Sequence, residues 1–349
     1  MIPAVIERGA GIDVGKTVLL VSTMVGPLDQ EPLTKTCTFG TTNADLERLR
    51  CWLVETGCTH VAMESTGSYW KPVFNVLEQS LTVVLANAED VKGRRGHKTD
   101  PKDSQWLAHL LRHGLIRPSF IPPRAVRDLR DLTRLRRQLL KDATSERNRV
   151  QKILEDSNVK LASVLADPFG VSGQLMLEAL LDGKASAEEI SELAKGRARR
   201  RIPELAASLA GHRMSDHHRR MIRYSLEHLG FLERQLLALD EEILREIDKA
   251  GFRPALDLIK TVPGIQQDSA VSVLAEVGPD MNTFPSAGHL SSWAGLCPGN
   301  RQSVGKDKGG RTTRGNRWLR TTMTQCAWAA SAKTNCYLKG KFWRLAAER

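Results

Sequence analysis

The sequence predicts two kinds of structure in one chain, an N-terminal α/β layer and a longer, mainly all-α remainder. Short β-branched segments alternate with helical ones up to residue 87, which is typical of an α/β architecture. From Ala125 onward, apolar residues recur at helical spacing within long charged segments. Aromatic residues, which strands favour, make up only 5% of the 349 residues. This composition suits Leu- and Ala-rich helical packing.

The N-terminal elements follow one another at short intervals. Residues 10–22 predict a strand, a tight Asp-Val-Gly-Lys turn and a second strand, because Val18 to Val21 form an aliphatic, β-branched run. Residues 43–57 have apolar side chains at helical spacing and end at a glycine. The other expected elements are a strand at 34–40, a strand at 60–66 with Glu64 at its end, a helix at 70–79, a strand at 81–87 and a helix from Pro101.

Two long helices are expected in the middle of the chain, at 125–155 and 222–250. In the second of these, Leu229, Leu232 and Leu236 recur at alternating intervals of three and four. This spacing is typical of the arms of a coiled coil, within one chain or between chains. An ordinary amphipathic bundle would give the same pattern.

A third unit is expected from Leu256. It contains a Pro-Gly-Ile turn with an Ala- and Val-rich helix at 259–278, a Gly-, Lys- and Arg-rich loop at 290–316, and a final helix from about Asn316. A chain of this length favours two or three domains. The predicted division is an α/β domain at 1–124, a helical coiled-coil region at 125–255 and a mainly helical domain at 256–349.

The positive charge of the chain is concentrated in two regions. The net charge is +11 and the isoelectric point is about 9.5. Residues 92–141 hold fourteen Lys/Arg against four Asp/Glu, and residues 299–320 hold seven against one. Two basic regions on an otherwise slightly acidic chain indicate a polyphosphate partner. A generally basic protein without such a partner is the alternative.

Several classes of protein are disfavoured by the sequence. No apolar run approaches the roughly 18 residues of a membrane span, and the N-terminus shows no secretory signal. The six cysteines form no C-x-x-C pair, and the nine histidines show no metal-binding pattern. We therefore expect reduced thiols and a bacterial-type cytoplasmic protein associated with the nucleoid.

Four carboxylates stand out by their context. Asp13 and Glu64 end predicted strands, where α/β folds place their sites, and Asp100 and Asp103 open a predicted helix. Asp100 before a proline is also a good N-cap, and Asp103 would then suit the helix dipole. Residues three apart share a helix face, so capping does not exclude metal binding. Carboxylates without His or Cys are the ligands that Mg²⁺ prefers, and paired ions serve phosphodiester chemistry.

The motifs around these residues resemble those of a known family. "GIDVGK", "MESTGSYW" and "KTDPKDSQWLAHLLR" are similar to the Asp-Glu-Asp-Asp motifs of the DEDD-type insertion-sequence transposases. "TVPGI" and "WAGLCPGNRQSVGK" resemble the C-terminal domain of the same family. The motifs occur in family order from about residue 10 to 330, whereas 160–250 is similar in character only.

This resemblance implies a fold and a function. The family comprises RNA-guided ("bridge RNA") recombinases with a RuvC-like, ribonuclease-H-like N-terminal catalytic domain. It implies that Asp13, Glu64, Asp100 and Asp103 bind Mg²⁺, with Mn²⁺ as an alternative. By register it assigns the nucleophile to Ser303, which would attack DNA and form a covalent phosphoserine link. The implied partners are donor and target DNA, a guide RNA, and further copies of the chain in a dimer or tetramer.

Ser303 has rivals as the nucleophile. A serine hydroxyl needs activation, and the nearest histidine in the sequence is His289. Without a metal, Ser303 would instead contact a phosphate. Ser291 and Ser292 precede Trp293 in what is expected to be a core helix, so Ser303 is preferred. Trp293 and Trp318 are expected in the core rather than as platforms for bases.

The basic residues are expected to hold nucleic-acid backbone, which sets affinity without reading sequence. The predicted contacts are Arg94, Arg95, Lys98, Lys102, Arg130, Arg134, Arg137, Arg301, Lys306, Lys308, Arg311, Arg314 and Arg317. No motif that reads bases is evident, so base pairing by a bound RNA would explain site choice. Two further hypotheses are a RuvC-like metal-dependent endonuclease without a serine–DNA intermediate and a non-catalytic RNA-binding scaffold.

Overall fold

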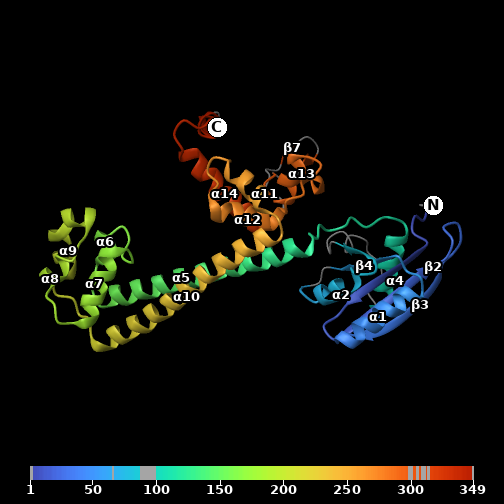
Figure 1. Cartoon of the computed structure of the whole chain (residues 1–349), viewed down its shortest axis with the longest axis horizontal. Coiled ribbons are helices and arrows are strands. Elements are labelled where there is room, and N and C mark those ends of the chain that lie inside the picture. The colour runs from blue at the N-terminus through green and yellow to red at the C-terminus, as the bar shows by residue number, and fades with distance from the viewer. Residues whose placement is uncertain are drawn as a thin grey trace. The chain divides into compact units, whose positions relative to one another are not determined.

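The structure is a computed structural model of the chain, which divides into two compact units, Met1–Ile121 and Pro122–Arg349. It describes residues 3–64, 67–86, 100–297, 302–303, 306–307, 312 and 315–347. For residues 100–102, 302–303 and 306–307 only the backbone is described. The expected α/β and all-α parts are both present (Figure 1). The finer division at residue 255 stays a prediction.

The first unit contains every strand of the main sheet. Its elements are β1 Arg8–Val14, β2 Val18–Val25, β3 Leu33–Gly40, α1 Asn43–Glu55, β4 His60–Glu64, α2 Trp70–Leu77, β5 Thr82–Ala86 and α4 Asp100–Arg112. The expected elements are therefore confirmed, with bounds that differ by a few residues. Helix α1 begins at a capping box between Thr42 and Asp45, which satisfies backbone N–H groups at its start.

The five strands form one mixed sheet in the order β3-β2-β1-β4-β5. Strands β1, β2 and β3 are antiparallel neighbours, while β4 is parallel to both β1 and β5. Side chains of a strand point alternately to the two faces. On β1, Ala10, Ile12 and Val14 join a core that includes Leu49 of α1 and Leu77 of α2. The intervening β1 residues face the side on which α4 packs.

Within its described residues, the named elements of the second unit are helices apart from one short hairpin. Its elements are α5 Arg124–Asp156, α6 Leu161–Val164, α7 Val171–Asp182, α8 Ala187–Ser191, η1 Gly196–Arg201, α9 Ile202–Leu209, α10 Asp216–Lys249, α11 Arg253–Lys260, α12 Gln267–Val277, η2 Met281–Thr283, α13 Ala287–Trp293, β6 Gln302–Ser303, β7 Lys306–Asp307, α14 Arg317–Ala332 and α15 Tyr337–Ala347.

The two long helices α5 and α10 pack along each other within the chain (Figure 1). Leu129, near the start of α5, shares a core with Ile243 and Ile247, near the end of α10. Ala143, further along α5, packs with Leu229 and Leu232. The pair is therefore antiparallel, and the heptad-like spacing reflects pairing inside one chain.

Two helical clusters occupy opposite ends of this pair in Figure 1. Helices α6 to α9 share a core with the end of α5 and the start of α10. Helices α11, α12 and α14 pack near the start of α5. All six cysteines are free thiols, as expected. None of the described helices combines the length and apolar character needed to cross a bilayer.

Candidate active site

Asp13 and Glu64 lie on adjacent parallel strands at the same edge of the sheet. The parallel register of β1 and β4 runs from Gly9↔His60 to Ile12↔Met63, and Asp13 and Glu64 are the next residue on each strand. Both residues are half-buried. The carboxyl ends of neighbouring parallel strands are where α/β sheets place ligands. The structure thus brings two of the predicted residues to one place.

Both residues also belong to the face of the sheet that α4 covers. Asp13 alternates with Ile12 and shares its side with Gly11, on which α4 lies directly. Glu64 shares its side with Ala62, which packs against Leu107 of α4. The covered face is thus common to the two carboxylates and the helix.

Helix α4 runs antiparallel to β1, so its first turn comes to the same edge. A Cβ built on Gly11 would lie 2.2 Å from the carbonyl oxygen of Ser104, and one on Gly9 would lie 3.2 Å from the Leu111 side chain. The start of α4 therefore lies toward the Asp13 end of β1. Asp100 and Asp103 belong to this first turn, and Asp103 is exposed. The side chain of Asp100 lies outside the described residues.

A chain of three hydroxyl groups, two of them buried, fixes the position of α4 on the sheet. The hydroxyls of Ser104 and Ser22 are 2.8 Å apart, and Ser22 is also 2.8 Å from the Thr36 hydroxyl. Ser22 and Ser104 are fully buried, so these hydrogen bonds satisfy groups that would otherwise be costly. Gln105 donates to Thr36 from the same helix. The hydroxyl chain thus sets the register of the turn that carries Asp103.

Arg112 fastens the other end of α4. Its side chain is buried and its Nη1 donates to the carbonyl oxygens of Ile6, Glu7 and Gly26, each at 3.2 Å. Its Nη2 reaches the carbonyl oxygens of the β2–β3 connection. Both ends of α4 are therefore held on the sheet by polar groups.

The chemistry of the donor set suits Mg²⁺. All four predicted ligands are carboxylates, and Mg²⁺ is commonly held by one or two carboxylates with the substrate phosphates and water. Among the described residues, no three His, Cys, Asp or Glu side chains are grouped closely enough to hold a metal ion. Asp13 and Glu64, on adjacent strands, could supply the two carboxylates that commonly hold Mg²⁺. The first turn of α4 lies at the same edge of the sheet.

Ser303 lies in the hairpin of the second unit. It pairs with Lys306 across the antiparallel strands β6 and β7. The chain returns from this loop at Asn316, whose N–H donates to the Trp293 carbonyl oxygen at 3.0 Å. The rivals Ser291 and Ser292 lie within α13, as the sequence predicted. The backbone of Ser303 thus belongs to a two-stranded hairpin, and its hydroxyl lies outside the described atoms.

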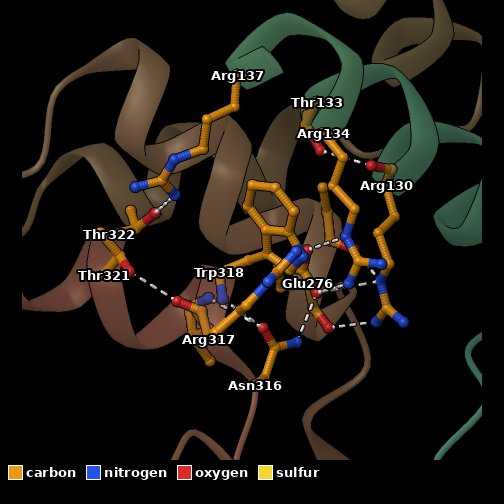
Figure 2. Close-up of polar contacts among 12 residues, drawn as sticks. Arg130, Thr133, Arg134, Arg137, Glu276, Asn316, Arg317, Trp318, Thr321 and Thr322 are labelled. Carbon is orange, nitrogen blue, oxygen red and sulfur yellow. Dashed lines mark hydrogen bonds and ion pairs between the residues drawn. The ribbon is translucent and has the colours of Figure 1, made fainter. Parts of the chain in front are cut away.

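Glu276 organises the base of this loop and was absent from the predicted site residues. This carboxylate is buried and accepts two hydrogen bonds from Arg134, Nε to Oε1 and Nη2 to Oε2, both at 2.9 Å (Figure 2). Asn316 donates to Oε2 at 2.6 Å, and its own side-chain oxygen caps α14 by accepting from the N–H groups of Trp318 and Leu319.

Arg130 contributes to the same cluster. Its Nη2 donates to the Glu276 carbonyl oxygen at 2.6 Å, and its Nε is 3.3 Å from Oε2 of that residue. Burial lowers the pKa of the Arg130 guanidinium, and the charge of Glu276 opposes this shift. The side chains of Arg130 and Arg134 thus pack the helices together, and the nucleic-acid contact expected of them stays a prediction.

Arg137 and Arg317 are placed differently. Both lie over the Trp318 ring, with guanidinium carbons 5.5 and 4.9 Å from its centroid (Figure 2). No carboxylate pairs with either within the described part of the chain. The remaining predicted contacts lie outside it, or only their backbone is described: Arg94, Arg95, Lys98, Lys102, Arg301, Lys306, Lys308, Arg311 and Arg314.

Comparison with known families places these features in context. Residues 10–158 match a model of the DEDD transposases of the IS110 group, described as a transposase. Residues 256–343 match a model described as "Transposase IS116/IS110/IS902 family". The two matches together span well over half of the chain. The chain belongs to the IS110 family of transposases.

The DEDD match covers the first unit of this transposase from residue 10, which contains the five-stranded mixed sheet, and the rest of the described chain is largely helical. RuvC of Thermus thermophilus matches with 13% identity and a TM-score of 0.25, over 32% of this chain and 99% of RuvC. RuvC of the same organism in complex with a Holliday junction substrate matches with 15% identity and a TM-score of 0.24, over 32% and 99%. No curated protein sequence matches the transposase significantly.

Proposed function

We propose that this transposase cuts and rejoins DNA strands through the carboxylates at the α4-covered sheet edge and through Ser303. The observation that carries the proposal is the meeting of Asp13, Glu64 and the first turn of α4 at one edge. Three separate stretches of sequence supply these groups. Capping alone would explain the two aspartates of α4, but it gives no reason for carboxylates on both neighbouring strands.

Asp13 and Glu64, with Asp100 and Asp103, would hold Mg²⁺ or Mn²⁺. When bound, the cation supplies Lewis-acid polarisation of the phosphate and lowers the pKa of a nearby hydroxyl. The carboxylates orient this assembly on the rigid sheet. Holding the reacting groups in place in this way is a large part of catalysis in phosphoryl transfer.

Ser303 supplies the nucleophile in this proposal. Its Oγ loses a proton and forms a bond to phosphorus, while the bond from phosphorus to one deoxyribose oxygen breaks and that oxygen leaves as a hydroxyl. The phosphate ester on Ser303 retains the energy of the broken bond. A hydroxyl from another strand then attacks this ester, joins the new strand and restores the serine. The two units act together, within one chain or between chains.

A bound RNA would provide the choice of site, and several copies of the chain would hold the DNA ends. Basic residues contact backbones and carry no sequence information. The α5–α10 pair forms inside one chain and so does not itself require a second copy. The demand for several copies comes from the four DNA ends of a recombination event. Sequencing the nucleic acids that copurify with the protein, together with light scattering of the complex, tests both points.

The central test is a strand-cleavage assay with trapping of protein–DNA adducts. We expect Asp13→Asn and Glu64→Gln to abolish metal-dependent cleavage with an unchanged circular dichroism spectrum, whereas Asp29→Asn, in an exposed loop, retains it. Ser303→Ala should remove the adduct, and Ser291→Ala should keep it. Full cleavage and joining by Ser303→Ala would remove the nucleophile and favour the metal-dependent endonuclease. Full activity of both carboxylate variants would favour the scaffold.

A further inference from the structure

A groove lies between α5, α12 and α14 of the second unit. Its volume is about 700 Å³, within the range of pockets that bind small ligands. Its lining includes Arg137 and Lys141 of α5, Ser269 and Ser272 of α12, and Arg317 of α14. All of these helices belong to one compact unit. We refer to this feature as the α5–α14 groove.

The α5–α14 groove has an excess of positive charge. Arg137, Lys141 and Arg317 line it, and no carboxylate pairs with any of them within the described residues. The acidic residue of the lining is Asp268, which accepts a hydrogen bond from Arg136 at 2.9 Å. Arg136 is itself shared with Asp240, so this trio of one guanidinium and two carboxylates carries a net charge of −1. Three cations are left facing the groove.

Two of these three cations, Arg137 and Arg317, are held in place by the fold. The guanidiniums of Arg137 and Arg317 rest on Trp318, and Arg137 also donates to the Thr322 hydroxyl at 3.4 Å (Figure 2). A third guanidinium, that of Arg134, lies 5.5 Å from the same ring and is fixed by Glu276. Side chains that are already ordered lose less entropy when a ligand binds. The ring is engaged by guanidiniums rather than left open for a base.

The groove also receives the beginnings of two helices. Ser269 lies in the first turn of α12 and Arg317 is the first residue of α14. Asn316 already accepts from the Trp318 and Leu319 N–H groups of α14, and the Gln266 side chain accepts from the Ser269 N–H of α12. These helix starts therefore add a partial positive charge, which favours anions. They add to the three cations, which are the independent sign of an anionic ligand. The groove is suited to phosphates and has no open aromatic face with which to read bases.

We propose that the α5–α14 groove holds the phosphodiester backbone of a single nucleic-acid strand. The groove is too small for a duplex, and its three cations would contact successive phosphates. This inference rests on the proposed function, since it supposes that the transposase acts on nucleic acid. It adds a binding site in the helical unit that takes no part in the chemical step.

The test compares two variants of the full-length protein with equal changes of charge. The first replaces Arg137, Lys141 and Arg317 by glutamine. The control replaces Arg197, Arg199 and Arg200, three exposed arginines of the same unit, by glutamine. Binding of fluorescent oligo(U) RNA and oligo(dT) DNA of equal length is measured by anisotropy at several salt concentrations, after bound nucleic acid has been removed.

Each phosphate contact to a single strand contributes about 0.7 to the slope of log affinity against log salt. Loss of three contacts should therefore reduce the slope by about 2 and weaken binding about 100-fold near 0.1 M salt. The probe that loses more identifies the strand as RNA or DNA. Unchanged slopes for both probes, or an equal loss in the control, would overturn the proposal.

A second variant guards against misfolding. Lys141→Glu reverses one charge at an exposed position whose side chain makes no described contact, and it should also weaken binding.

Failure of the groove proposal can be distinguished from failure of the proposed function. Asp13→Asn should abolish cleavage at every protein concentration and leave oligonucleotide binding intact. The groove variant should regain cleavage at saturating concentration, as a change in KM rather than kcat.

Discussion

Arg134 of α5 donates two hydrogen bonds of 2.9 Å to the carboxylate of Glu276 on α12 (Figure 2). The same carboxylate accepts a hydrogen bond from Asn316, the N-cap of α14. Three helices that are distant in sequence therefore meet at one buried anion. Asn316 also ends the loop that contains Ser303, so the Glu276 carboxylate positions one end of that loop. The same carboxylate holds α14 beside α12, and both helices line the α5–α14 groove.

We expect Glu276→Gln to lower the free energy of unfolding of the helical unit by about 3 kcal/mol. The substitution leaves two arginines beside a neutral side chain, and breaking a buried ion pair by removing one partner costs about 3–5 kcal/mol. Urea unfolding followed by far-ultraviolet circular dichroism measures the effect. Glu233→Gln is the control, since it removes an exposed partner of Arg147, and such pairs contribute about 0–1 kcal/mol. Equal costs for the two variants would contradict the role given to Glu276.

Gly11→Ala should displace α4 and impair cleavage. The added Cβ would lie 2.2 Å from the Ser104 carbonyl oxygen and 2.4 Å from the Ala108 nitrogen, and neither backbone atom can move alone. Overpacking of this kind costs about 1–3 kcal/mol, and here it also shifts the turn that carries Asp103. Cleavage rates and thermal unfolding are the measurements. Gly230→Ala within α10 is the control, because only the Arg234 side chain lies near and alanine favours a helix.

Much of the first unit could be predicted because its signals are local. The β-branched run at Val18 to Val21 and the helical spacing at 43–57 specify elements from adjacent residues. The ends of β1 and β4 then placed Asp13 and Glu64 correctly on one sheet edge. These residues are neighbours because β1 and β4 pair in parallel. That pairing depends on the tertiary structure and cannot be predicted from the pattern of either strand alone.

The roles of the arginines on α5 could not be predicted for the same reason. Arg130, Arg134 and Arg137 occur in one basic region, and such an excess of positive charge indicates a surface that binds nucleic-acid backbone. Only folding reveals that Arg130 and Arg134 face Glu276 while Arg137 faces the groove. One signal was present, since Glu276 is an acid within the apolar stretch "AVSVLAEVG". Charged residues are seldom buried unless they are paired.

Arg112→Lys should weaken the attachment of α4 to the sheet. The buried guanidinium donates to several carbonyl oxygens from one rigid fork, whereas an ammonium group has three donors and a different shape. We expect a loss of about 3 kcal/mol, because hydrogen bonds of charged groups contribute about 1.5–3 kcal/mol each. Hydrogen exchange of the β1 and β2 amides reports this change within the first unit. Arg48→Lys on α1, which is exposed, should leave that exchange unaltered.

The α5–α10 pair should lose stability in acid through Glu146. This carboxylate of α5 is buried, and the His228 Nδ1 of α10 lies 2.9 Å from its Oε1. Burial raises its pKa, but hydrogen bonds from His228 and Arg149 outweigh burial and hold the pKa below the ordinary value of 4.5. A carboxyl with a lower pKa in the folded state favours folding above its unfolded pKa. That stabilisation is lost as the pH falls through the folded pKa.

Glu146→Gln should therefore cost more stability at pH 6 than at pH 3. Urea midpoints of the variant and the unaltered protein at both pH values give the two differences, which cancel the contribution of other carboxylates. Glu241→Gln, an exposed acid on α10, provides the same change of charge as a control. An equal cost of Glu146→Gln at both pH values would mean that the pKa of this carboxyl is the same in the folded and the unfolded state, so that its hydrogen bonds do not outweigh burial. A cost that grows as the pH falls would mean that the pKa of Glu146 is raised in the folded state. Burial would then outweigh the two hydrogen bonds.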